Sequence, residues 1–400
     1  MTSAPLRLLV LHPALAPYRV DSFNALSRRT AFRLVFLEEN VAYQPFDQAR
    51  LRALLDVEPG YLLSGLNVGK RTIRLGVGAE IRRHQPDVVV TTEFGQAALA
   101  VQAHRRLGVG AFAHVVATED NPASVLEETR FHALGRKVLL PLVDGVLTYS
   151  EQACALYRER FGATAPVTAS PLVQSEAVIE ARLASAGGAA RALASCHGLL
   201  GRRVLLYVGR LAPEKRVDRL IDAVGRLRTA FPDLLLALVG DGPERAALER
   251  HAAERAPAGS VLFAGRLEGE ALSAWYRLGV VFALASAFEP FGAVVNEALL
   301  AGLPAVVSDR AGAHTLVAEG INGAAVDAAR PEALDAALAG WLRRQAPLDE
   351  AQLATPRPSR MVTTFEQAVD AFVTGLEAAR RHRLGARALR PAGSSDGGRV

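Results

Sequence analysis

Cysteine is almost absent from this chain, and aromatic residues are few. Two cysteines, Cys154 and Cys196, cannot build a disulfide framework or a zinc site of four thiolates. Longer apolar runs, such as 280–287, fall far short of the roughly 20 residues that span a bilayer. The first run, 6–11, lacks the charged preamble and the cleavage site of a secretory signal. We therefore expect a reducing, cytoplasmic environment and no transmembrane helix.

Basic charge is concentrated near the end of the chain. The net charge is +5, and residues 380–400 hold six arginines and one acid, Asp396, which accounts for the whole excess. A nucleic-acid-binding protein carries a basic face on its folded body, often among aromatics, which here make up only 6%. We therefore expect no nucleic-acid partner. We interpret the tail as a solvated segment or as a peripheral contact with the anionic inner face of a membrane.

Apolar runs alternate with amphipathic stretches along the chain, which is typical of βαβ units and a parallel sheet. The predicted strands of the first half are 6–11, 34–37, 88–92, 111–117 and 145–149, and those of the second half are 204–208, 234–239, 261–264, 280–285, 305–308 and 323–326. The expected fold class is α/β, with two Rossmann-like, doubly wound parallel-sheet domains facing a central cleft.

The expected domain boundaries follow from composition. Residues 174–197 are rich in alanine and lack a strand pattern, so we interpret them as a helix followed by a flexible connector. An N-terminal domain then covers 1–173, and a C-terminal domain covers 198–362. Apolar residues at helical spacing predict a terminal helix over 363–383 that returns toward the N-terminal domain, and a disordered basic tail over 384–400.

Residues 287–304, AFEPFGAVVNEALLAGLP, follow an apolar run and open a helix. The unpaired amides of the first helical turn, near Phe291 and Gly292, favour an anion such as a phosphate. Glu297, further into the helix, can offer two oxygens to a vicinal diol, and Glu289 faces the loop side where a sugar could lie. The structural alternative is that these acids only stabilise the helix dipole.

A second segment, 204–218, reads VLLYVGRLAPEKRVD. Its buried strand ends in Gly209 and Arg210, and Lys215 lies in the loop before the next helix. A forked guanidinium and a point charge at the end of one strand suit a diphosphate. Taken alone, the segment also fits an ordinary surface loop.

Four segments in sequence order resemble the retaining nucleotide-sugar glycosyltransferases of glycosyltransferase family 4, which have the GT-B fold. They are 208–223 (VGRLAPEKRVDRLIDA), 238–249 (LVGDGPERAALE), 261–267 (VLFAGRL) and 288–309 (FEPFGAVVNEALLAGLPAVVSD). The resemblance implies transfer of a sugar from a nucleotide diphosphate to an acceptor hydroxyl, with retention at the anomeric carbon and without a metal or other cofactor. The acceptor would be a glycan, a lipid-linked saccharide or a small metabolite, received by the N-terminal domain.

The same resemblance assigns roles within the C-terminal, donor-side domain. Arg210 and Lys215 would contact the diphosphate, Glu289 the transferred sugar, and Glu297 the ribose hydroxyls. Catalytic roles fall to Glu289, Arg210 and Lys215. Gly209 is a further donor-binding position. Arg266 and Leu267 would border the nucleotide base. The backbone around Phe291, Gly292, Ala293 and Val294 would meet the distal phosphate and the sugar.

The first domain departs from the family pattern. The glycine-rich loop that commonly follows the first strand is missing, because no glycine precedes Gly60 and the segment reads HPALAPYRVDSFNAL. His12, Tyr18 and Arg19 in this segment could face the acceptor or the donor phosphate. The alternative is that its prolines shape a turn and Tyr18 packs.

A later segment, HVVATEDNPAS, places Glu119 and Asp120 at the end of a predicted strand and His114 inside it, where we expect a core residue. Either carboxylate could orient or deprotonate an acceptor hydroxyl, or could instead form a turn or helix cap. Glu93, at the end of another strand, is a third candidate on the acceptor side.

The segment 308–327 departs from the family in detail, because Ala311, Gly312 and Thr315 replace the usual glycine pair and the following glutamate. Two further functions fit the same fold. One is a nucleotide-sugar epimerase or hydrolase that needs no acceptor. The other is a non-catalytic protein that binds a nucleotide sugar or a glycan.

Overall fold

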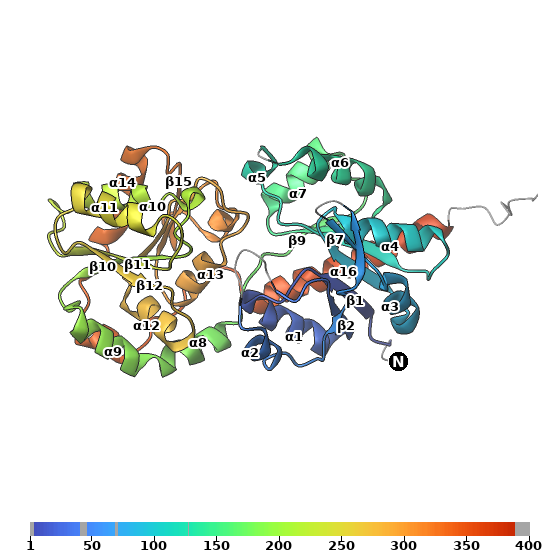
Figure 1. Ribbon diagram of the computed structural model, residues 1–400, viewed down its shortest axis with the longest axis horizontal. Helices are drawn as coiled ribbons and strands as arrows, with labels where there is room; N and C mark the ends of the chain where they lie inside the picture. Colours follow the sequence, from blue (N-terminus) through green and yellow to red (C-terminus); the bar gives the residue numbers. More distant parts are fainter. Residues whose placement is uncertain (1–3, 41–45, 69–70, 127, 389–400) are drawn as a thin grey trace, which may run out of the picture. The chain divides into compact units, whose positions relative to one another are not determined.

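The computed structural model describes residues 4–40, 46–68, 71–126 and 128–388. Contacts divide the chain into two units (Figure 1). Unit 1 comprises Met1–Pro122, Glu127–Pro171 and Glu366–Val400, and unit 2 comprises Ala123–Leu126 and Leu172–Phe365. Each unit is built on its own parallel sheet, so the expectation of two parallel-sheet α/β units is confirmed.

The sheet of unit 1 has seven parallel strands in the order β3-β2-β1-β6-β7-β8-β9. These are β1 (Arg7–His12), β2 (Ala31–Phe36), β3 (Gly60–Tyr61), β6 (Val88–Thr92), β7 (Ala113–Ala117), β8 (Gly145–Thr148) and β9 (Val167–Ala169), and a separate antiparallel hairpin pairs β4 (Gly65–Val68) with β5 (Arg71–Arg74). The sequence pattern did not predict β3 and β9, because two or three residues are too few to show a periodicity.

Helices cover both faces of this sheet. They are α1 (Val20–Arg29), α2 (Gln48–Arg52), α3 (Val77–His84), α4 (Gln96–Arg106), α6 (Arg130–Leu139), α7 (Glu151–Ala155) and α16 (Phe365–Ala388). Along β1, Leu8 and Val10 pack in one cluster with residues of α1 and α16, whereas Leu9 and Leu11 pack in another with residues of α3 and α4. This alternation follows from the two-residue period of a strand that is buried on both faces.

The sheet of unit 2 has six parallel strands in the order β12-β11-β10-β13-β14-β15. These are β10 (Arg203–Val208), β11 (Leu234–Val239), β12 (Val261–Gly265), β13 (Val281–Leu284), β14 (Ala305–Ser308) and β15 (Gly323–Val326). The helices are α5 (Pro122–Leu126), α8 (Glu176–Ser185), α9 (Gly187–Cys196), α10 (Val217–Leu227), α11 (Arg245–Arg255), α12 (Gly269–Leu278), α13 (Ala293–Leu300), α14 (Pro331–Arg343) and α15 (Glu350–Ala354).

Two expectations about the connecting segments need correction. The flexible connector is wrong, because most of its length forms α9, which packs on α12 with Ala190 and Ala194 buried. The glycine pair that suggested flexibility lies in the first turn of that helix. The terminal helix α16 continues to Ala388, so the tail does not begin at residue 384, and residues 389–400 lie outside the described part of the chain.

The terminal helix belongs to unit 1. Leu376 and Ala379 of α16 are fully buried in the cluster that also holds α1, and Arg29 of α1 pairs with Glu366 and Asp370. Within the described residues, no helix is both long enough and apolar enough to cross a membrane.

Candidate functional site

The loops that follow β10 and β13 lie at one edge of the unit 2 sheet. Strand β10 is the first strand of this sheet along the chain, and it pairs with β11 on one side and β13 on the other. The strand order therefore reverses at β10, and ligands of open α/β sheets bind outside the carboxyl ends of the strands at such a point. Two of the predicted motifs supply these two loops.

The two loops are joined directly. Lys215, at the end of the 3₁₀ turn Pro213–Lys215, donates through Nζ to Glu289 Oε2, and their side chains are only 16% and 14% exposed. The amide of Ala287 donates to the carbonyl of Glu214 at 2.8 Å. The structure thus brings Lys215 and Glu289 together across 74 residues of sequence.

Arg210 also lies in the loop after β10, but its side chain is more exposed than that of Lys215. Its Nη2 donates to Glu214 Oε1 at 2.6 Å, and the side chain is 42% exposed. The Arg210 carbonyl accepts a hydrogen bond of 2.9 Å from the Tyr207 hydroxyl, which fixes the backbone just after Gly209. The guanidinium can therefore exchange its partner for a ligand at little cost, since exposed ion pairs are weak.

Helix α13 begins beside Glu289, the partner of Lys215. Gly292 precedes its first residue, has a φ of +97°, and would place a Cβ 3.1 Å from Glu289 Cγ, so glycine suits the position. Glycine has no side chain to cap the first-turn amides, which include those of Ala293 and Val294. Those amides and the positive end of the helix dipole are the features that bind phosphates.

A third loop, after β14, packs against the start of α13. The amide of Gly312 donates to the carbonyl of Glu289 at 3.0 Å, and the amide of Ala313 donates to the carbonyl of Phe291 at 2.6 Å. A Cβ at position 312 would overlap the carbonyl oxygen of Pro290. The remaining glycine of the altered family motif is thus required by a close backbone approach.

Glu297 lies within α13 and is half-buried. Its Oε2 accepts a hydrogen bond of 2.7 Å from the Tyr276 hydroxyl, and its Oε1 accepts one of 3.3 Å from Gln174 Nε2. Burial raises the pKa of Glu297, and the bonds from Tyr276 and Gln174 oppose that shift. Sequence reasoning missed both partners, because they come from α12 and from the segment before α8.

The two residues that were predicted to border the nucleotide base lie further along the same edge of the unit 2 sheet. Arg266 and Leu267 follow β12, which is the outermost strand and two positions from β10. Arg266 donates through Nη2 to Glu268 at 2.7 Å, and both side chains are about half exposed. A ligand that reaches from Lys215 to Arg266 would have to pass the end of β11.

In unit 1, the predicted residues also follow neighbouring strands. Arg19 donates to Glu119 Oε1 at 3.0 Å and to the Tyr149 hydroxyl, which itself donates to Glu119 at 3.2 Å. The Arg19 guanidinium lies 5.4 Å from the Tyr149 ring centroid and 6.0 Å from that of Tyr18. Tyr149 follows β8 and was not predicted.

His12, at the end of β1, has a packing role in this structure. Its Nδ1 lies 2.9 Å from the Ala14 carbonyl, and its ring forms T-shaped contacts with the rings of Phe23 and Phe36. Burial, together with the charge of Arg19, lowers the pKa of His12 to about 3. This histidine is therefore neutral at ordinary pH.

A second group in unit 1 joins Glu93 to the loop after β7. Glu93 has a φ of +59°, which is uncommon outside glycine, and its carboxylate accepts hydrogen bonds from the Glu119 amide at 2.8 Å and the Thr118 hydroxyl at 3.1 Å. Burial, then the nearby charge of Asp120, raises the pKa of Glu93 to about 8. Glu93 thus holds its proton more tightly than an ordinary carboxyl.

Asp120 is held by two partners. Its Oδ2 accepts hydrogen bonds of 2.9 Å from Arg136 Nη1 and 2.5 Å from the Tyr157 hydroxyl. The Arg136 guanidinium lies 3.8 Å from the ring centroid of Phe161 and also pairs with Glu128. His114 is confirmed as a core residue, since it is buried and forms hydrogen bonds with Thr91 of β6 and Gln102 of α4.

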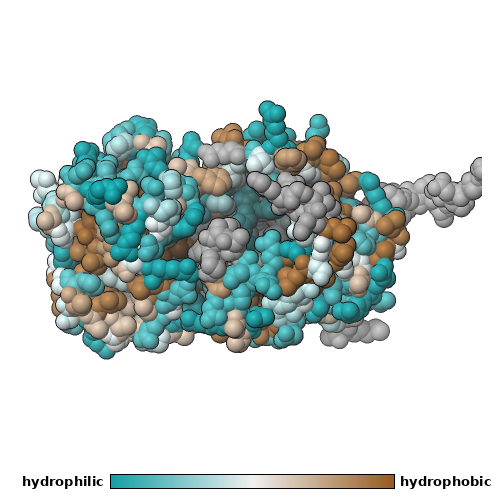
Figure 2. Space-filling view, viewed as in Figure 1, coloured by the Kyte–Doolittle hydropathy of each residue, from teal (hydrophilic) through white to brown (hydrophobic). Residues whose placement is uncertain are grey.

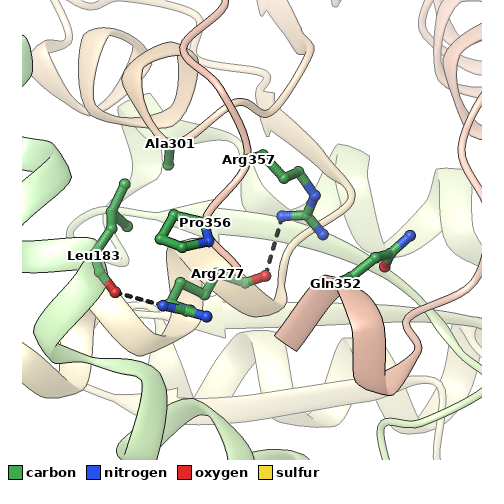
Figure 3. Close-up of a pocket in the computed structure, with 6 residues that line it drawn as sticks. All are labelled: Leu183, Arg277, Ala301, Gln352, Pro356 and Arg357. Atoms are coloured by element: carbon green, nitrogen blue, oxygen red, sulfur yellow. Dashed lines mark hydrogen bonds between the residues drawn. The ribbon is translucent and has the colours of Figure 1, made fainter. Parts of the chain in front are cut away.

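Two arginines that bind backbone carbonyls near helix ends line a small depression in unit 2 (Figure 3). Arg277 donates to the carbonyls of Leu183 at 2.8 Å and Leu353, and Arg357 donates to the Arg277 carbonyl at 3.0 Å. These carbonyls lie near the carboxyl ends of α8, α15 and α12, where cations are stabilised. The predicted site residues do not line this depression.

The fold has counterparts among solved glycosyltransferases. Anabaena Alr3699/HepE in complex with UDP and glucose aligns with a TM-score of 0.62 and 16% identity, over 96% of this chain and 99% of that one. A lipopolysaccharide outer core galactosyltransferase, WaaB, aligns with a TM-score of 0.64 and 17% identity, over 93% and 99% of the two chains. At such identities, the likeness defines the fold, which is GT-B.

The sequence of unit 2 is more specific. Residues 197–354 match the family described as glycosyl transferases group 1. An alpha-D-kanosaminyltransferase of Streptomyces kanamyceticus is 34% identical over 141 residues, which is 35% of this chain and 36% of that protein. A GDP-mannose-dependent alpha-(1-6)-phosphatidylinositol monomannoside mannosyltransferase of Mycolicibacterium smegmatis is 34% identical over 153 residues, 36% of this chain and 40% of that protein. The similar segment thus spans well under half of each relative.

Proposed function

We propose that the protein transfers a sugar from a nucleotide diphosphate to an acceptor hydroxyl, as a retaining enzyme of the family 4 type. The observation that carries the proposal is the Lys215–Glu289 ion pair. It lies beside Gly292 at the start of α13, where the strand order of unit 2 reverses. The similarity of residues 197–354 to glycosyl transferases group 1 supports the same assignment.

The donor diphosphate would lie between the loops after β10 and β13. Arg210 and Lys215 would supply two cations, and the first amides of α13 would supply hydrogen-bond donors. When the bond from the anomeric carbon to the distal phosphate oxygen breaks, negative charge grows on the departing nucleotide. Fixed donors and cations stabilise that charge without reorganising.

Lys215 would change partners when the donor binds. In the free protein its ammonium is held by Glu289, and a diphosphate would compete for it. Glu289, once released, would accept hydrogen bonds from hydroxyls of the transferred sugar. Each oxygen of Glu297 has one partner and keeps a lone pair for the ribose diol.

Retention requires the new bond to form on the face that the leaving group departs from. The acceptor oxygen would bond to the anomeric carbon as the phosphate oxygen leaves, and the acceptor proton would pass to that departing oxygen. Neither step needs a protein nucleophile. We propose that the two cations and the helix amides balance the charge without a metal, so turnover should survive EDTA.

The acceptor would be received by unit 1, at the carboxyl edge where Arg19, Glu93, Glu119 and Asp120 lie. Asp120 is engaged by Arg136 and Tyr157, so it would serve to position the loop after β7. Glu119 faces Arg19 and the Tyr149 hydroxyl, and these three groups offer a donor and an acceptor for a sugar hydroxyl.

The test is product analysis in two stages. A thermal-shift panel of UDP, GDP, ADP and dTDP sugars first selects the donor, because a ligand of the native state raises its stability. The selected donor is then incubated alone and with acceptor saccharides, and the anomeric configuration of the product is read by proton NMR. Transfer with retention is expected. Epimerised or hydrolysed donor without any acceptor would favour the alternative enzyme, and binding without turnover would favour a non-catalytic protein.

Alanine variants then test the assigned residues. Replacing Glu289, Arg210 or Lys215 should lower turnover at least about tenfold, which corresponds to about 1.4 kcal/mol of transition-state stabilisation. Full activity in any of the three variants contradicts its assignment.

A further inference from the structure

Three neighbouring elements of unit 1 expose large apolar side chains. These are the β4–β5 hairpin, α4 with the residue that follows it, and α6. The side chains are between 48% and 79% exposed. These apolar side chains, together with the exposed cations described below, form what we call the apolar–basic surface. Its apolar members are Leu66, Leu99, Leu107, Phe131, Leu134 and Val138.

The three elements are adjacent in space. Leu62, just before the hairpin, packs in the same cluster as Val101 of α4. Ala98 of α4 packs in the same cluster as Leu139 of α6. Figure 2 shows hydrophobic residues on the surface where Figure 1 labels α4 and α6. The exposed side chains therefore belong to one side of unit 1.

Helix α6 has an apolar stripe on its outer face. Phe131, Leu134 and Val138 are spaced by three and four residues, so they share one side of the helix. Leu139 and Arg136 are buried on the other side. A surface helix normally turns its apolar stripe to the core. Leu134 and Val138 of this second stripe are instead exposed, where an occupant from outside the chain can cover them.

These elements carry basic residues and no acid. The stretches 60–79, 95–110 and 129–143 contain eight Lys and Arg and no Asp or Glu, and two of the eight, Arg105 and Arg136, pair with acids of adjoining segments. With 41 acids in 400 residues, stretches of this combined length would hold about five on average. Arg106, Arg130 and Lys137 are exposed beside the apolar side chains. A partner of negative charge with an apolar interior satisfies both features.

We propose that the apolar–basic surface docks on an anionic lipid bilayer. The apolar side chains would enter the boundary between headgroups and acyl chains, and the three cations would lie at the level of the headgroups. This inference does not depend on the proposed transferase activity. It also differs from a contact made by the basic tail, because the surface lies on α4, α6 and the hairpin.

Flotation with vesicles tests the inference with the full chain. One set of vesicles contains phosphatidylcholine alone. The other contains phosphatidylcholine with about 30 mol% phosphatidylglycerol, which gives the vesicles a negative surface charge. The wild type is expected to float with the anionic vesicles and to be released by high salt. Leu134→Ser with Val138→Ser should weaken the partitioning at least about tenfold, which is about 1.4 kcal/mol.

Matched variants separate the alternatives. Leu200→Ser with Ile321→Ser removes two exposed apolar side chains of unit 2 and should leave flotation unchanged. Arg130→Gln with Lys137→Gln should weaken flotation and reduce its salt dependence. Circular dichroism checks that each variant is folded.

Three results would overturn the inference. The wild type could remain unbound to anionic vesicles. The Leu134 and Val138 variant could float as the wild type does while Arg390→Gln with Arg399→Gln abolishes flotation, which would assign binding to the tail. Sedimentation could instead show a dimer that the serine changes dissociate, without vesicle binding, which would make the surface a protein interface.

Discussion

The ion pair between Lys215 and Glu289 leads to a specific prediction about nucleotide affinity. Glu289→Gln keeps the size of the side chain and removes its charge. Because the two side chains are only 16% and 14% exposed, an effective dielectric constant of about 20 applies, and opposite charges about 4 Å apart attract by about 4 kcal/mol. Desolvation offsets part of this attraction. A diphosphate that displaces Glu289 from Lys215 breaks the ion pair. Its binding free energy is therefore less favourable by the part of the attraction that remains after desolvation.

We therefore expect Glu289→Gln to bind a nucleoside diphosphate at least about tenfold more tightly, a gain of about 1.4 kcal/mol. The same change should lower the melting temperature of the free protein, because Lys215 is left without its partner. A variant that is less stable but binds nucleotide more tightly is the signature of this competition.

Isothermal titration with the nucleoside diphosphate, without its sugar, isolates this effect from sugar contacts. Glu332→Gln is the control, because it removes an exposed acid of unit 2 that pairs with Arg330. Equal or weaker affinity of a folded Glu289→Gln protein would refute the competition and the placement of the diphosphate at Lys215.

Three further predictions concern stability. The pKa of Glu93 is raised from 4.5 to about 8, so the native state keeps a proton that the unfolded chain releases, and stability falls as pH rises through this window by up to about 1.4 kcal/mol per pH unit. Glu93→Gln should therefore be more stable than the wild type at pH 9 but not at pH 4.5, as measured by urea unfolding. The pKa of His12 is lowered from 6.5 to about 3, so stability is lost as pH falls between these values, and His12→Asn should shift less in its urea midpoint between pH 7 and pH 4. Gly312→Ala should lower stability by about 1–3 kcal/mol because its Cβ meets the Pro290 carbonyl, whereas Gly340→Ala, in open space on α14, should raise it by about 0.5–1 kcal/mol in calorimetry.

The sequence predicted the parts of the fold whose signal is local. Strands such as β10 and β11 are continuous apolar runs, because a parallel strand covered on both faces needs no alternation. Gly292 could be placed at the start of a helix because its neighbours follow a strand and open an amphipathic segment. These signals placed the loops after β10 and β13, and with them Lys215 and Glu289.

The remaining features depend on contacts that periodicity does not encode. Tyr276 reaches Glu297 from α12, and Tyr149 reaches Arg19 across 130 residues of sequence. The segment of α9 was predicted as a connector because Gly187 and Gly188 usually indicate flexibility. Packing of Ala190 and Ala194 against α12 overrides that propensity, since small side chains allow two helices to approach closely.

Hydrogen exchange with the selected nucleotide sugar tests the central assignment most directly. If the diphosphate is held at the start of α13 with the help of Arg210 and Lys215, amides in 209–216 and 289–297 should gain protection when the donor is saturating, and Lys215→Ala should lose that protection at the same concentration. Donor binding that protects only residues of unit 1, or that leaves both loops of unit 2 unchanged, would contradict the account.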